Sequence, residues 1–137
     1  MKKVAILVSR GSYNSLVQVM TLVMACMVSE IKVRLFFRDE SVFKLTPQEA
    51  GKINLTEFYK GQETNVIARL KQNKLENLQS LLREVKEKGD IHVAVCSSSL
   101  AICGLRHEDL IPEVDEVQGL TSFLLEEMST ADQILTF

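Results

Sequence analysis

Two short, almost continuous apolar runs constrain the fold of this chain most. They cover residues 3–8, Lys-Val-Ala-Ile-Leu-Val, and residues 91–95, Ile-His-Val-Ala-Val, and a helical pattern follows each of them. Apolar runs of this length with little alternation indicate strands that are covered on both faces, as in a parallel sheet. We therefore expect an α/β chain whose strands are joined by helical crossovers.

The patterns between and after these runs predict the other elements. We expect an apolar helix over 14–29 with its cap at Asn14 or Ser15, and a strand with one wet face over 31–37. Leucines at helical spacing predict a helix over 75–85. The remaining expected elements are a short helix to about 104, a weak strand over 113–117, a helix over 120–128 and a last strand over 133–137.

These elements predict one domain, a three-layer α/β/α sandwich around a mainly parallel, five-stranded sheet. A length of 137 residues suits a single domain with a hydrophobic core of its own. Residues 38–73 have weak periodicity, and we expect an irregular or partly helical excursion there. The patterns leave the order of the strands open.

Composition excludes several classes of protein. The chain has 16 Lys and Arg against 18 Asp and Glu, so we do not expect nucleic acid as a partner. The apolar stretch 16–28 is too short for a membrane span and contains Gln18 and Thr21. We see no signal peptide, and three cysteines without metal-type spacing favour the reducing cytoplasm. We expect neither a metal nor an organic cofactor.

Basic and acidic residues are unevenly distributed along the chain. No Lys or Arg follows Arg106, whereas eight Asp and Glu residues do. We expect these acidic side chains to form ordinary solvated surface. The alternative is an acidic face that meets a basic face of a second subunit.

Cys96 is the strongest candidate for chemistry because of its position. It follows the strand over 91–95, and ligands collect at the carboxyl ends of strands in open α/β sheets. It also precedes a helix start, where free N–H groups and the helix dipole stabilise a thiolate. Ser97, Ser98 and Ser99 can cap this helix and shape an anion-binding concavity. The alternative is a buried structural cysteine.

The other candidate residues have weaker support. Arg10 and Gly11 follow the first strand, so we expect them at the same edge as Cys96, where they could hold an anion. Cys103 is a possible second thiol, but seven helical residues span about 10 Å, beyond the reach of a disulfide. His92 lies two pleats from Cys96, too far to deprotonate it, so we expect a core histidine and no hydrolase.

Several segments of the chain resemble the DsrE/DsrF-like family. Segment 96–111 has a cysteine at a strand end, a short helix that closes with Gly-Leu at 104–105, and a charged turn at 108–110. Segment 119–124, Gly-Leu-Thr-Ser-Phe-Leu, is similar to a Gly-containing helix start of the family. The resemblance covers nearly the whole chain and is loose only over 46–73.

The resemblance implies a sulfur-relay protein. Members of this family carry sulfur on a cysteine as a persulfide or a thiosulfonate and pass it to another cysteine protein. Carried over, that role falls on Cys96. The resemblance also implies sulfur-donor and sulfur-acceptor proteins, or small sulfur compounds, as partners, and it implies assembly into homo-oligomers.

Our leading hypothesis is therefore a cytoplasmic sulfur carrier, or a sulfurtransferase that works by thiol exchange at Cys96. We expect the N–H groups of Ser97–Ser99 to hold the terminal anionic group. Two rival hypotheses use the same residues. One is a non-catalytic module that binds a nucleotide or another anion, and the other is a structural subunit of an oligomer with an inert cysteine.

Overall fold

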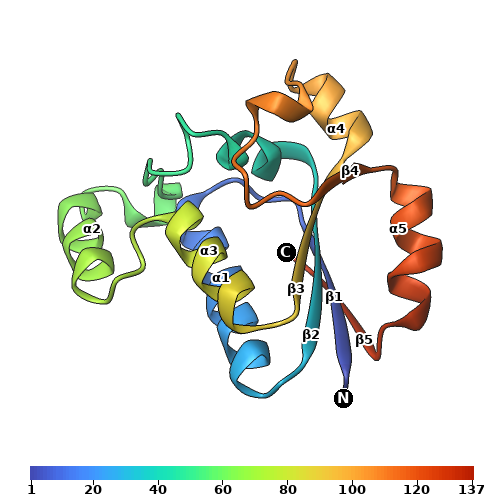
Figure 1. Ribbon diagram of the computed structural model, residues 1–137. Coiled ribbons are helices and arrows are strands. Elements are labelled where there is room, and N and C mark those ends of the chain that lie inside the picture. Colours follow the sequence, from blue (N-terminus) through green and yellow to red (C-terminus); the bar gives the residue numbers. More distant parts are fainter.

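Five parallel strands form the centre of the computed structural model, which describes residues 1–137 (Figure 1). They lie in the order β4-β3-β2-β1-β5, and every neighbouring pair is parallel. The three central strands bury most of their residues on both faces, which explains their long apolar runs. The strands are β1 (Lys3–Val8), β2 (Lys32–Phe37), β3 (Ile91–Cys96), β4 (Glu116–Gln118) and β5 (Gln133–Thr136).

Helices cover the two faces of the sheet unequally. Helices α1 (Tyr13–Val28) and α3 (Leu78–Lys88) pack on one face, and α5 (Leu120–Glu126) lies on the other (Figure 1). Helix α4 (Ser97–Ile102) follows β3 beyond the carboxyl ends of the strands, and α2 (Glu63–Gln72) projects to one side. The predicted three-layer sandwich with a five-stranded sheet is confirmed, and the sheet is wholly parallel.

Two apolar clusters reflect this unequal cover. The larger cluster has 27 buried residues, most of them from the sheet, α1 and α3. Helix α5 buries a single side chain, Phe123, whose ring stacks on Phe36 with 4.6 Å between centroids. The attachment of α5 to the sheet therefore depends mainly on one aromatic residue. The smaller cluster consists of six buried residues, which are Ala5, Leu7, Phe36, Ala94, Cys96 and Phe123.

Burial against the sheet accounts for the apolar character of α1. Seven of its 16 residues are buried. The predicted cap at Asn14 or Ser15 is wrong, because Ser12 occupies the N-cap position. The Asn14 side chain instead accepts a hydrogen bond from the Thr56 N–H at 3.0 Å. No helix of the structure has both the length and the apolar surface that crossing a bilayer requires.

Residues 38–73 contain short elements separated by loops. The 3₁₀ helices η1 (Asp39–Leu45) and η2 (Glu57–Tyr59) precede α2. Lys44, in the last turn of η1, is buried, and its Nζ donates a hydrogen bond to the Lys52 carbonyl at 2.6 Å. This contact anchors the loop that follows η1 to the body of the domain.

Acidic residues of the last third of the chain pair with basic residues of the first two thirds. Arg83 Nε lies 3.2 Å from Glu113 Oε2. Glu127 Oε2 lies 2.8 Å from Lys3 Nζ and 3.3 Å from Arg34 Nε. Part of the acidic charge in the last third of the chain is therefore neutralised by basic residues of the same chain. The acidic side chains are not all the solvated surface that the sequence predicts.

Candidate functional site

Cys96 lies where β3 ends and α4 begins, at the carboxyl edge of the sheet (Figure 1). Its backbone is extended, with φ −63° and ψ 122°, and the chain enters the helix at the next residue. The side chain belongs to the cluster that contains Phe123, so it faces α5. The thiol is therefore located at the junction of strand and helix.

Hydrogen bonds around Cys96 favour its thiolate. Ser98 Oγ lies 3.1 Å from Cys96 Sγ. Burial acts to raise the pKa of Cys96, but the hydroxyl and backbone N–H groups of Ser98 and Ser99 outweigh it and lower the pKa below the ordinary value. The first turn of α4 thus supplies donors to the sulfur, because its N–H groups have no partner inside the helix.

Ser99 connects Cys96 to the loop after β2. Its Oγ accepts a hydrogen bond from the Asp39 N–H at 2.9 Å. Because the hydroxyl oxygen accepts there, its hydrogen is available for Cys96. Asp39 has a φ of 55°, in the left-handed region that costs free energy for residues other than glycine. A strained residue therefore helps to orient a hydroxyl group beside the thiol.

Replacement of Ser98 by alanine is expected to raise the pKa of Cys96. The nearest hydroxyl donor is lost while the burial of the sulfur stays. At pH 7 a smaller fraction of the thiol is ionised, so alkylation of Cys96 by iodoacetamide slows and its rate profile moves to higher pH. Ser97→Ala is the matched control, since no hydrogen bond joins the Ser97 hydroxyl to the sulfur. A profile that is the same in both variants would contradict this role of Ser98.

The two other residues of the predicted anion site follow β1. Arg10 is exposed and makes no ion pair. The Gly11 N–H donates to Glu40 Oε1 at 3.2 Å, so it is already occupied. A Cβ atom at Gly11 would lie 2.9 Å from Glu40 Cβ, which explains the glycine. The part of Arg10 and Gly11 in anion binding stays a prediction.

The three cysteines are free and have different surroundings. Cys26 belongs to the larger apolar cluster, and Cys103 packs against the same cluster. Burial raises the pKa of Cys26, and burial together with the Asp39 carboxylate raises the pKa of Cys103. Cys96 alone has a lowered pKa, so it is the cysteine with the largest thiolate fraction at neutral pH.

His92 lies on the same face of β3 as Cys96, but its imidazole contacts two carboxylates. Its Nε2 is 2.9 Å from Glu116 Oε1, and its Nδ1 is 3.5 Å from Asp115 Oδ2. The side chain is about one-third exposed, so the prediction of a core histidine is wrong. No hydrogen bond connects this imidazole to the thiol.

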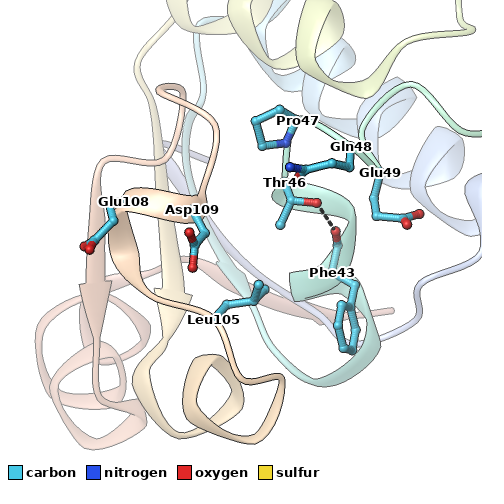
Figure 2. Close-up of a pocket in the computed structure, with 8 residues that line it drawn as sticks. All are labelled: Phe43, Thr46, Pro47, Gln48, Glu49, Leu105, Glu108 and Asp109. Atoms are coloured by element: carbon cyan, nitrogen blue, oxygen red, sulfur yellow. Dashed lines mark hydrogen bonds between the residues drawn. The ribbon is translucent and has the colours of Figure 1, made fainter.

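A surface pocket of about 550 Å³ lies outside the surroundings of Cys96 (Figure 2). Its charged residues are the carboxylates Glu49, Glu108 and Asp109. Figure 2 shows the pocket between the segment 43–49 and the segment 105–109. With neither a thiol nor a cation in its lining, the pocket does not compete with Cys96 as the candidate site.

Sequence reasoning did not single out Gln118, which the sheet places beside Cys96. The two residues are paired in the register of β3 and β4. Gln118 is 8% exposed, and its Oε1 has no hydrogen-bond partner. No sequence signal indicates this residue, because the register of a three-residue edge strand follows from tertiary packing.

Comparisons with known proteins agree with this fold. The model of the DsrE/DsrF-like family matches residues 2–137, whereas no curated protein matches the chain. The solved structure of MTH1491 from Methanobacterium thermoautotrophicum, a protein of unknown function, is similar with a TM-score of 0.61. It has 13% identity, and the match covers 98% of this chain and 99% of that one, so it supports the fold alone. Because the family model spans essentially the whole chain, the protein belongs to the DsrE/DsrF-like family.

Proposed function

We propose that this protein is a sulfur carrier that holds a persulfide or a thiosulfonate on Cys96 and passes the sulfur to a partner thiol. The observation that carries the proposal is a strand-end thiol whose pKa is lowered by donors from Ser98 and Ser99. Membership of the DsrE/DsrF-like family is compatible with this role.

The proposed chemistry is thiol exchange without net oxidation. The Cys96 thiolate attacks the outer sulfur of a donor persulfide, R–S–SH. The S–S bond of the donor breaks, R–S⁻ leaves with the electron pair, and a persulfide forms on Cys96. Attack by an acceptor thiolate on the new outer sulfur reverses the sequence and regenerates the Cys96 thiolate. This exchange requires no general base beside the thiol, because the attacking group is already ionised.

We expect a donor to approach Cys96 from the exposed residues beside it. Cys96 itself is 4% exposed, whereas Ser97 and Ser98 are exposed at the start of α4. A donor thiol would reach the sulfur from this edge of the sheet. Backbone N–H groups of Ser97–Ser99 would contribute hydrogen bonds to the terminal charge of the cargo.

The proposal includes a compartment and partners. Three free cysteines suit the reducing cytoplasm, where thiols stay reduced and exchange is possible. The donor and the acceptor would be cysteine proteins or small sulfur compounds. A homo-oligomer remains part of the proposal, and it would be measured by the solution mass of the purified protein.

Intact-mass analysis tests the proposed function directly. The protein is incubated with glutathione persulfide or tetrathionate, and its mass is compared with that of the untreated protein. We expect the mass to increase by one sulfur atom with the persulfide and by one thiosulfonate group with tetrathionate. Dithiothreitol should remove both groups, and peptide mapping should locate them on Cys96. A mass that stays unchanged with both reagents would refute the carrier function.

A further inference from the structure

The end of β4 contains a buried polar group that the proposed exchange does not use. The Nε2 of Gln118 donates to Glu126 Oε2 at 3.1 Å, while its Oε1 is buried without any partner. The residue as a whole is 8% exposed. Native structures contain few orphaned polar atoms of this kind, and each calls for an explanation. A ligand that is absent from the unloaded protein would explain this one.

Gln118 and Cys96 lie on the same face of the sheet, the face that α5 covers. They are register partners on parallel strands, and the strands lie about 4.8 Å apart. Residues paired in this way project from the same face of a sheet. Both side chains reach α5, since Gln118 is bonded to Glu126 and Cys96 belongs to the cluster of Phe123.

Gln118 is placed to contact a second sulfur atom rather than the thiol itself. The hydrogen bonds to Cys96 come from Ser98 and Ser99, and none comes from Gln118. A sulfur atom added to Cys96 would extend about 2 Å beyond Sγ. We expect it to lie between β3, β4 and α5, the elements that hold Cys96, Gln118 and Glu126.

We propose that the side-chain amide of Gln118 binds the outer sulfur of the persulfide carried on Cys96. The inference rests on the proposed function and adds a residue that distinguishes the loaded state from the free thiol. In the free protein Glu126 holds the Nε2 group. When the outer sulfur is anionic, a half-turn of the amide directs an N–H to it.

The half-turn improves the hydrogen bonding of the Gln118 amide when Cys96 carries a persulfide. It places Nε2 where Oε1 had no partner, so the amide donates a charge-assisted hydrogen bond to the anionic sulfur, and Oε1 turns toward Glu126. The Glu126 carboxylate then faces an amide oxygen, but its side chain is exposed and turns toward water, which can also donate to Oε1 on that side. The loaded state therefore has a donor on the side where the unloaded state has an acceptor without a partner.

The equilibrium of sulfur exchange with glutathione and glutathione persulfide tests this inference. The loaded fraction is measured by intact mass at several ratios of the two compounds. In Gln118→Met we expect the equilibrium constant for loading to fall roughly tenfold. The alkylation rate of the unloaded thiol should stay unchanged. Glu126→Ala should raise the constant, because the amide loses its competing acceptor. Gln133→Met, at an exposed glutamine of β5, is the matched control without effect.

The outcomes separate this inference from the proposed function. If the wild-type protein takes up no sulfur, both are refuted. If the wild-type protein is loaded and Gln118→Met has the same equilibrium constant, only the role of Gln118 is refuted. Should Gln118→Met fail to fold, Gln118→Asn and Glu126→Ala decide the question. Constants equal to that of the wild type in both variants would overturn the inference.

Discussion

Cys96→Ser is expected to abolish the uptake of sulfur from every donor. A serine hydroxyl is not ionised at neutral pH and forms no bond that thiol exchange could use, so the intact mass should stay at that of the unloaded variant. The substitution keeps a similar shape and leaves the donors of Ser98 and Ser99 in place. Far-ultraviolet circular dichroism should therefore be unchanged, which separates loss of chemistry from loss of fold.

The other cysteines provide the comparison for this variant. Cys26→Ala removes a buried thiol of the larger cluster and should be loaded like the wild type. Cys103→Ala tests the predicted second thiol. We expect the Cys103→Ala variant to be loaded like the wild type. Burial and the Asp39 carboxylate raise the pKa of Cys103, so this thiol is a weaker nucleophile for sulfur uptake than Cys96. A mass increase that persists in Cys96→Ser would show that another residue carries the sulfur. Slower discharge from Cys103→Ala would instead assign Cys103 a role in transfer.

Phe123→Ala is expected to lower the free energy of unfolding by about 3–5 kcal/mol. The side chain is fully buried, it stacks on Phe36, and α5 buries no other residue. Its loss leaves a cavity in a cluster that has only six buried members. Urea unfolding followed by circular dichroism measures the effect as a lower midpoint with little change in slope.

The same variant should also make Cys96 more accessible, since Phe123 and Cys96 share the small cluster. Alkylation of Cys96 in the folded protein is then expected to be faster than in the wild type. Leu124→Ala is the matched control, because Leu124 lies on the same helix and is about half exposed. Its effect on stability should stay within about 0.5 kcal/mol. Similar losses in both variants would show that α5 is not held mainly by Phe123.

The sequence predicted the bounds of the central strand β1 well and those of the edge strand β4 less well. The run over 3–8 became β1 with the same bounds, because a strand covered on both faces needs apolar residues throughout. The predicted strand over 113–117 appears instead as Glu116–Gln118. Glu113 lies outside the sheet and is buried through its bond with Arg83, a pairing that no local pattern encodes.

The first residues of helices were also harder to predict than the presence of the helices. The leucine pattern over 75–85 predicted the helix too early, since α3 begins at Leu78. Asn77 caps it by accepting a hydrogen bond from the Ser80 N–H at 3.0 Å. Leu75 remains in the preceding loop, where its carbonyl accepts a hydrogen bond from the Tyr13 hydroxyl at 2.5 Å. Local spacing shows that a helix exists, and tertiary contacts decide where it begins.

The candidate site also has parts that the sequence predicts and parts that it does not. The position of Cys96 at a strand end could be inferred from neighbouring residues in the sequence. The link from Asp39 to Ser99 joins residues 60 positions apart, and the pairing of Gln118 with Cys96 depends on strand register. Such contacts follow from the strand order, and hydrophobic periodicity leaves that order undetermined.

The position of β5 has a consequence for how this protein matures during synthesis. β5 pairs with β1, so Val4 lies opposite Gln133, and α5 connects the two distant edges of the sheet. The ribosome must release the chain through β5 before these partners can meet. Until then the edge of β1 is unpaired in the nascent chain, and any chaperone that protects this edge would have to act in that interval.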